Sequence, residues 1–446
     1  MRRVVFVFSL MGAIGLTGTV SANSVGQSLR PLARPLAELV PVAAAASTVV
    51  RPQLRPAGQA AKRLDAPVQT ATNPGFESWV RGFRGRALAK GISASTFDRA
   101  FRGVEFDAGV IERDRNQSEF TRTIWQYLDS AVSEKRVRNG KNALRQHQRT
   151  LDAIEARYGV EKEVVLAVWG LESSYGDFRG DLDVIQSLAT LAFDGRRGKF
   201  FEAQLIGALQ ILQSGDVAPR NMTGSWAGAM GHTQFIPTSY LAFAVDFTGD
   251  GKRDIWSEDP TDALASTAAY LQRSGWKNGQ PWGVEVNLPG NFNFGLANRK
   301  TLKSPAEWAN LGVVGLNGSA VPNHGAASIL LPAGGNGAAF MIFSNFRAIE
   351  RYNAADAYVI GVGHLSDRIN GGPAINARWP EGERGLTERE KKEVQRRLTR
   401  AGFDTQGIDG KFGPNTINAV RAYQRSIGAK ADGYPGAKLL KQLRGR

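Results

Sequence analysis

Residues 164–176 read Val-Val-Leu-Ala-Val-Trp-Gly-Leu-Glu-Ser-Ser-Tyr-Gly. The i, i+3, i+4, i+7 spacing that marks one face of a helix is occupied by Val165, Val168, Trp169 and Glu172. A carboxylate therefore takes the last place on an apolar stripe. Because an unpartnered buried carboxylate is costly, we expect Glu172 to stay protonated near neutral pH, as a general acid for glycosidic bond cleavage must. The alternative is an ordinary amphipathic helix whose Glu lies just past the buried turn and reaches water.

The amino-terminal sequence is typical of an exported protein. Met1-Arg2-Arg3 is followed by an apolar run to about Thr17 and by small residues ending at Ala22, which predicts a secretory signal over residues 1–22. An uncleaved signal anchor is the alternative, and no later stretch approaches membrane-spanning length. The chain has no Cys, which excludes a lipid anchor at the cleavage site, disulfides and thiol-based catalysis. These features predict a bacterial periplasmic or secreted protein.

The formal net charge of +15 favours a polyanionic partner. Nucleic acid is the usual candidate for such a charge. For an exported chain, the acidic cell wall fits better, so we expect a wall-associated protein that binds no nucleic acid.

Composition divides the 446 residues into several parts. Residues 23–75 are rich in Pro and Ala and predict a disordered tether. Residues 76–370 predict one large, mainly α (α+β) domain with a minor β-sheet, residues 371–385 a linker, and residues 386–446 a small three-helix bundle. Helical periodicity covers residues 79–90, 94–101, 121–131, 140–158, 162–172, 185–191 and 199–213, and the best strand signals are residues 283–288 and 338–343.

Three blocks of sequence resemble the membrane-bound lytic murein transglycosylase B family. They are residues 169–176 (Trp-Gly-Leu-Glu-Ser-Ser-Tyr-Gly), the Gly-rich residues 224–240, and residues 345–358. The resemblance extends over roughly residues 76–369 and implies a lysozyme-like helical fold. It also implies non-hydrolytic cleavage of the bond between N-acetylmuramic acid and N-acetylglucosamine in peptidoglycan.

The chemistry of the residues agrees with that resemblance. Glycoside hydrolysis normally needs two carboxylates, whereas this chain has one carboxylate set in an apolar, aromatic-flanked motif. A lytic transglycosylase needs only one. Glu172 would protonate the leaving oxygen and then accept the proton of the C6 hydroxyl of the same muramic acid, which gives a 1,6-anhydro product. The resemblance suggests that the substrate N-acetyl group assists in place of the second carboxylate, and no cofactor is required.

The family resemblance also implies a set of substrate-binding residues. These are Ser225, Gln234, Tyr127, Tyr270, Tyr352, Asn353 and Tyr358. Aromatic faces stack on sugars, and phenolic hydroxyls orient polar groups of the substrate. The alternative is core packing for each Tyr, and an ordinary Gly-rich loop for the segment that carries Ser225 and Gln234.

Residues 246–252 open like a calcium-binding EF-hand loop. Ser257 stands where the bidentate Glu of that loop is normally found, and the resemblance implies that Asp262 closes the site instead. The predicted ligands of this structural Ca²⁺ are Asp246, Thr248, Asp250, Lys252 and Asp262. A neutral Thr ligand predicts weak affinity, and a solvated turn is the alternative.

The last sixty residues resemble the peptidoglycan-binding-domain-like family. The Asp-Gly-x-Phe-Gly-x-x-Thr signature of that family appears at residues 409–416. The resemblance implies peptidoglycan glycan strands as the partner of this module. We expect the whole protein to act as a monomer.

Competing chemistries have little support in the sequence. The four His residues are too scattered for a zinc amidase, and the Ser-x-x-Lys at residues 274–277 has no following Lys-Thr-Gly. No phosphate-binding Gly-rich loop is present. Two alternatives stay open: a hydrolytic muramidase that uses water, and a catalytically silent peptidoglycan-binding scaffold.

Overall fold

The computed structural model describes residues 73–115 and 122–445. The predicted signal segment and nearly all of the predicted tether lie outside these residues. Within the described ranges, no helix combines the length and the apolar character that crossing a membrane would need.

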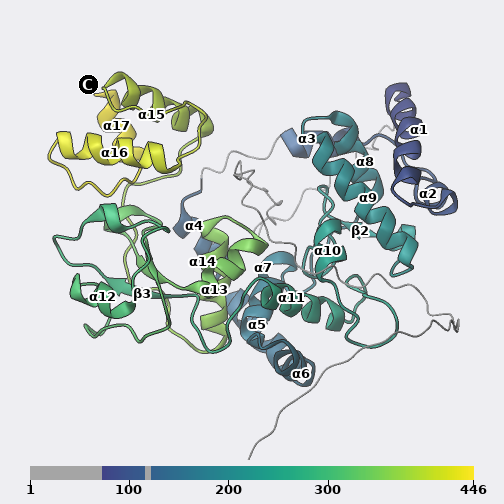
Figure 1. Ribbon diagram of the computed structural model, residues 1–446, viewed down its shortest axis with the longest axis horizontal. Helices are drawn as coiled ribbons and strands as arrows, with labels where there is room; N and C mark the ends of the chain where they lie inside the picture. The colour runs from purple at the N-terminus through teal and green to yellow at the C-terminus, as the bar shows by residue number, and fades with distance from the viewer. Residues whose placement is uncertain (1–72, 116–121, 446) are drawn as a thin grey trace, which may run out of the picture. The chain divides into compact units, whose positions relative to one another are not determined.

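The first helix begins earlier than its periodicity predicts. Helix α1 (Pro74–Ala89) starts at Pro74 rather than at residue 79, because the Asn73 side chain accepts a hydrogen bond from the Phe76 N–H and proline suits the first helical position. Figure 1 shows α1 and α2 (Ala94–Ala100) beside α8 (Val184–Asp194) and α9 (Gly198–Ser214), with which they form contacts. The short α3 (Ala108–Arg115) also packs on α8.

A second group of helices surrounds α7 (Lys162–Ser173), which carries Glu172. The predicted single helix over residues 140–158 is wrong: it is two helices that meet at His147. The His147 N–H closes the first helix, and its C=O accepts the first hydrogen bond of the next, so the chain turns there. The helices of this part of the chain are α4 (Ile124–Ala131), α5 (Glu134–Gln146) and α6 (Gln148–Tyr158).

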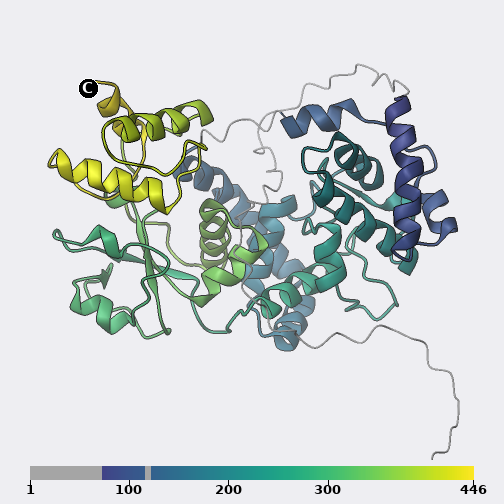
Figure 2. The same ribbon diagram turned by 45° about the horizontal axis from the view of Figure 1, so that its top comes forward.

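Helix α7 is buried on all sides rather than along one stripe. Every residue from Val164 to Gly170 is buried. Its neighbours are α5, α6, α11 (Thr261–Arg273) and α14 (Asp356–Ile369). In Figure 2, α7 lies at the centre of this helical group. A helix that is apolar all round is the expected centre of a large core.

Two small sheets complete this part of the chain. Strands β1 (Leu182–Asp183) and β2 (Thr223–Gly224) form an antiparallel pair. The other sheet is antiparallel in the order β4-β3-β6-β5, with β3 (Gly283–Asn287) and β6 (Ala339–Ile342) at its centre. These two central strands match the two strands predicted from the sequence, each slightly shortened. The edge strands are β4 (Val314–Gly315) and β5 (Ser328–Leu330).

The elements around this sheet enclose a separate apolar cluster centred on the fully buried Trp308. The remaining short elements are η1 (Pro219–Asn221), α10 (Pro237–Phe243), η2 (Phe294–Leu296), α12 (Pro305–Asn310), η3 (Gly334–Asn336) and α13 (Ser344–Tyr352).

The segment predicted as a linker has neither helix nor strand, yet it has fixed contacts. The Trp379 ring stacks on Trp125 with centroids 5.8 Å apart. The Glu285 carboxylate accepts hydrogen bonds from the backbone N–H groups of Asn376 and Ala377. Residues 376–379 of this segment are therefore held in place.

The carboxyl-terminal module has a core of its own. Helices α15 (Glu388–Arg400), α16 (Pro414–Ser426) and α17 (Ala437–Arg444) enclose a cluster that includes Val394, Val420 and Leu440. Thr387 caps α15, and Glu390 completes the capping box. The mainly helical fold with a minor sheet is confirmed.

Candidate active site

Glu172 lies in the last turn of α7, and its side chain is buried. The residue is 8% exposed, and its Oε1 accepts a hydrogen bond of 2.7 Å from the Tyr358 hydroxyl. The alternative in which this carboxylate lies past the buried turn and reaches water does not hold. The structure therefore brings together a buried acid and a hydroxyl donor that are 186 positions apart in the sequence.

Tyr358 is held by the corner between α13 and α14. It lies in the first turn of α14, and the Arg299 guanidinium pairs with Glu350 on α13 and with Asp356 on α14. Arg299 also lies over the Phe346 ring, 5.1 Å from its centroid. One half-buried cation thus pairs with both helices of the corner that positions Tyr358 against Glu172.

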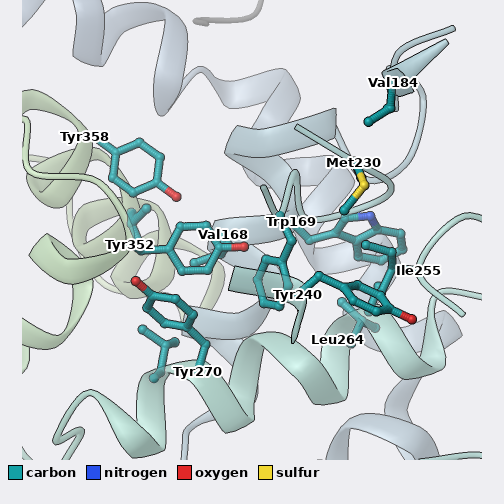
Figure 3. Packing of buried hydrophobic residues seen from close by; sticks show 14 of the residues in the cluster. Val168, Trp169, Val184, Met230, Tyr240, Ile255, Leu264, Tyr270, Tyr352 and Tyr358 are labelled. Carbon is teal, nitrogen blue, oxygen red and sulfur yellow. The ribbon is translucent and has the colours of Figure 1, made fainter. Parts of the chain in front are cut away.

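Three of the predicted tyrosines form one cluster, which Figure 3 shows. The rings of Tyr270 and Tyr352 have centroids 4.8 Å apart, and those of Tyr352 and Tyr358 are stacked at 6.4 Å. The Tyr352 hydroxyl donates to the Thr233 carbonyl, and the Tyr270 hydroxyl donates to the Arg351 carbonyl. These two hydroxyls therefore tie α11, α13 and the Gly-rich loop together beside Glu172.

Tyr127 approaches the same carboxylate from α4. Burial and, secondly, the negative charge of Glu172 raise the pKa of Tyr127 well above its usual value. A Cβ at Gly361 of α14 would meet both the Tyr127 ring and the side chain of Leu171, the residue before Glu172, so Tyr127 lies near the end of α7 that carries Glu172. Asn353 follows Tyr352 directly, and its Oδ1 accepts a hydrogen bond from the Ala355 N–H within the α13–α14 corner.

Ser225 and Gln234 lie at the two ends of a tight Gly-rich loop. The Ser225 Oγ accepts from the Ala229 N–H, and the Gln234 Nε2 donates to the carbonyls of Arg179 and Gly231. Gly231 has φ +66°, and a Cβ there would lie 2.1 Å from the Ile255 carbonyl oxygen. The loop is therefore held closely against its neighbours, and both predicted residues help to hold it.

His232 joins this loop to helix α7, a role that the sequence did not reveal. Its Nδ1 accepts from the Trp169 indole N–H at 3.1 Å, which leaves the Nε2–H to donate to the Ser257 carbonyl at 2.7 Å. The Ser173 hydroxyl donates to the His232 carbonyl at 2.6 Å. Burial lowers the pKa of His232, so the neutral ring is the stable form. No local signal reveals this link, because Trp169 and His232 are 63 positions apart.

The backbone immediately after Glu172 adopts an unusual conformation. Ser174 and Tyr175 have φ of 53° and 64°, in the left-handed region that residues other than Gly rarely occupy. The Tyr175 hydroxyl donates to the Arg136 carbonyl, and its ring packs so closely on Gly170 that a Cβ there would lie 2.6 Å away. The ring contact and the hydrogen bond hold this strained turn at the end of α7.

Four carboxylates are buried among the residues that the structure describes, and Glu172 is one of them. Asp114 pairs with Arg196 and Arg197, and Asp216 pairs with Arg253. Asp262 accepts backbone N–H hydrogen bonds in the loop that begins at Asp246. The other three buried carboxylates thus have partners of their own elsewhere.

The predicted metal loop brings three of its five predicted ligands together. Carboxylate oxygens of Asp246, Asp250 and Asp262 lie within 4.8 Å of one another. The Thr248 hydroxyl contacts Asp246, while Lys252 donates its backbone N–H to Asp250. Several oxygen donors from one short loop are what Ca²⁺ requires, so the residues fit a hard cation.

Comparison with known proteins yields two family matches. The Transglycosylase SLT domain profile matches residues 75–367, and a peptidoglycan binding domain profile matches residues 388–443. Membrane-bound lytic murein transglycosylase B from Escherichia coli is 33% identical over 251 residues, which are 55% of this chain and 66% of that protein. The aligned stretch is thus just under two thirds of the length of that relative.

Solved structures show the same fold. SltB3 from Pseudomonas aeruginosa, in complex with NAG-anhNAM-pentapeptide, is 51% identical with a TM-score of 0.81 and covers 83% of this chain and 100% of its own. The Escherichia coli lytic transglycosylase Slt35, in complex with calcium, is 29% identical with a TM-score of 0.57 and covers 68% of this chain and 94% of its own. The expected lysozyme-like transglycosylase fold is confirmed. The chain therefore belongs to the transglycosylase SLT-domain family, in the group of lytic transglycosylases that includes membrane-bound lytic murein transglycosylase B and SltB3.

Proposed function

We propose that this protein is a lytic transglycosylase that cleaves the β-1,4 bond between N-acetylmuramic acid and N-acetylglucosamine in peptidoglycan, for turnover or remodelling of the cell wall. The observation that carries the proposal is the buried Glu172 with its hydrogen bond from Tyr358, in a chain of this family. The anhydro muramic acid in the ligand of SltB3 supports the same reaction here.

In this mechanism Glu172 acts twice. It first donates its proton to the glycosidic oxygen as the bond from that oxygen to C1 of the muramic acid breaks. The resulting carboxylate then accepts the proton of the C6 hydroxyl as the oxygen of that hydroxyl bonds to C1. The attack is intramolecular, so its high effective molarity favours the 1,6-anhydro product over reaction with water. The substrate N-acetyl group assists at C1, which makes a second carboxylate unnecessary.

We assign the tyrosine cluster and the Gly-rich loop to substrate binding. Tyr358 orients the acid, and Tyr127, Tyr270 and Tyr352 supply aromatic faces around it. The Asn353 Oδ1 accepts a hydrogen bond within its own turn. We therefore assign the amide N–H groups of Asn353 as donors to the sugar. We assign Ser225 and Gln234 to the same site, because the loop that they hold accepts the Tyr352 hydroxyl at Thr233.

Product analysis separates this proposal from its two rivals. Mass spectrometry of digested sacculi should show muropeptides that end in anhydro muramic acid. Reducing muramic acid ends would instead identify a hydrolytic muramidase. Binding to sacculi with no soluble products would identify a silent scaffold.

We propose the following organisation for the exported protein. Residues 1–22 are a signal, and the residues from there to the start of α1 are a tether. Residues 74–370 form the catalytic domain, residues 371–385 a linker and residues 386–446 a wall-binding module. The protein works as a monomer at the bacterial cell wall, in the periplasm or outside the cell. Fractionation of cells and amino-terminal sequencing of the mature protein test both the location and the cleavage site.

We also propose that the loop of Asp246, Asp250 and Asp262 binds a structural Ca²⁺ of weak affinity, with Thr248 and Lys252 completing the site. The cluster of carboxylates and the calcium complex of Slt35 support this proposal. Added Ca²⁺ should raise the thermal unfolding temperature of the wild type, since a ligand that binds only the folded state stabilises it. The Asp250→Asn variant should lose that response. An equal response in the variant would place any Ca²⁺ elsewhere.

A further inference from the structure

A pocket of about 220 Å³ lies at the amino-terminal end of α13. Its walls include Ile342, Phe343 and Phe346, and none of the proposed substrate-binding residues lines it. Sites for whole drug-sized ligands measure about 300–1,000 Å³. This pocket is smaller than such sites, so its size suits one end of an extended ligand.

The pocket carries excess positive charge. Arg299 lies at its edge but is already paired with Glu350 and Asp356. Lys277 and Arg347 also line it, and both are exposed cations with no ion pair among the residues that the structure describes. These two charges favour an anionic ligand.

A buried amide fixes the backbone of Lys277 to the first turn of α13, the helix that carries Arg347. The fully buried Asn345 accepts from the Lys277 N–H at 2.8 Å and donates its Nδ2 to the Lys277 carbonyl at 2.9 Å. Arg347 follows Asn345 by two positions on α13. The rim of the pocket is therefore preorganised, which lowers the entropic cost of binding a ligand.

We propose that this pocket binds the carboxylate-bearing end of a peptide stem of peptidoglycan. The proposal rests on the proposed function and deepens it, because it assigns recognition of the stem to residues outside the sugar site. Arg and Lys bind a carboxylate, Arg with two parallel hydrogen bonds, and the apolar walls suit the small side chains of a short peptide. A bare phosphate would leave those walls without a partner.

The distance to the sugar site suits a peptide stem. Arg347 precedes Tyr352 by five residues on α13, which is about 8 Å at 1.5 Å per residue. An extended peptide covers about 3.3–3.6 Å per residue, so a stem of three or more residues spans that distance.

Binding of free peptide to the full-length protein tests the inference. Ligand-detected NMR would compare a synthetic stem pentapeptide with the same peptide amidated at its carboxyl terminus. Loss of a charge-assisted contact corresponds to about a tenfold loss of affinity, so we expect that loss for the amidated peptide and for Arg347→Gln and Lys277→Gln. Lys300→Gln removes an exposed charge outside the pocket and should bind like the wild type.

Three results would overturn the inference. They are equal affinity for the two peptides, no binding of either peptide, and displacement of the peptide by an equimolar concentration of inorganic phosphate, which would reveal a general anion site.

Kinetics on glycan strands supply a second readout. On strands that carry stems, Arg347→Gln should raise KM about tenfold and leave kcat unchanged, since a contact to a remote part of the substrate contributes uniform binding. On strands from which the stems have been removed, the variant should equal the wild type. A kcat defect on both substrates would contradict a stem-specific role. Absence of anhydro products from the wild type would contradict the proposed function instead, so the two failures are distinguishable.

Discussion

Glu172 and Tyr358 illustrate how far single residues can be interpreted from sequence. Glu172 stands out locally, because a carboxylate ends an otherwise apolar helical run. Its partner does not, because Tyr358 is distant in the chain and only the fold brings the two together. The link from Trp169 through His232 to Ser257 was missed for the same reason. Burial of the acid was predictable from the local sequence, and Tyr358 entered the predicted site only through the family resemblance, whereas His232 was not predicted at all.

Tyr358→Phe removes the hydroxyl that donates to Glu172 and keeps the ring. A hydrogen bond to a charged group contributes about 1.5–3 kcal/mol, so we expect kcat to fall about 10- to 100-fold with the thermal unfolding temperature nearly unchanged. Release of anhydro muropeptides measures the rate. A wild-type rate would show that this hydrogen bond does not serve catalysis.

Gly231→Ala tests the close approach of the Gly-rich loop. The new Cβ would meet the Ile255 carbonyl at a residue that already has positive φ, so we expect a loss of about 2–4 kcal/mol in the free energy of unfolding. Gly275 also has positive φ but no neighbouring atom within 4 Å, so Gly275→Ala measures the backbone effect alone, about 1 kcal/mol. Urea denaturation compares the two, and equal losses would contradict a steric role for Gly231.

At the scale of elements, hydrophobic periodicity predicted where most helices lie, but not which of their faces are buried. Helix α7 was expected to have one apolar face and is buried all round, because α5, α6, α11 and α14 enclose it. The break at His147 was not predictable, because no Gly or Pro marks it. The central strands β3 and β6 were found because both are apolar and short.

Helix α14 should make the stability of the protein sensitive to acid through His364. Burial, and then the charge of Arg368, lower the pKa of His364 to about 4 in the folded protein, against 6.5 for the unfolded chain. The neutral form is therefore favoured by folding. The contribution of His364 to the free energy of unfolding is complete above pH 6.5. It falls by about 3 kcal/mol as the pH decreases from 6.5 towards 4.

Urea denaturation at several pH values checks this expectation. The fall in the free energy of unfolding between pH 6.5 and 4 should shrink in His364→Gln and persist in His324→Gln, since His324 lies outside α14. Because burial also lowers the pKa of His232, part of the slope should remain in His364→Gln. An unchanged slope in His364→Gln would contradict the assignment.

For the whole molecule, the helical carboxyl-terminal module was predictable from the sequence, whereas the contacts between distant segments were not. The carboxyl-terminal module encloses its own core, as its three short apolar patterns suggested. Two contacts of the predicted linker were not foreseen, that of Trp379 with Trp125 and that of the Asn376 backbone with Glu285, because a run rich in Gly and Pro carries no sign of what it touches.

The net charge of +15 predicts salt-sensitive binding to the cell wall. Raising NaCl from about 0.05 M to about 0.5 M shortens the Debye length severalfold, so co-sedimentation with sacculi should fall. Binding to sacculi through the carboxyl-terminal module should persist at the higher salt concentration. Binding that does not depend on salt would show that charge contributes little.

The central claim is that one buried carboxylate serves as both acid and base. Mass spectrometry of sacculi digested by the wild type and by Glu172→Gln tests it most directly, with unfolding temperature and sacculus binding as controls. We predict anhydro muramic acid products from the wild type and none from a variant that folds and binds normally. Anhydro products released by Glu172→Gln at the wild-type rate would contradict the account.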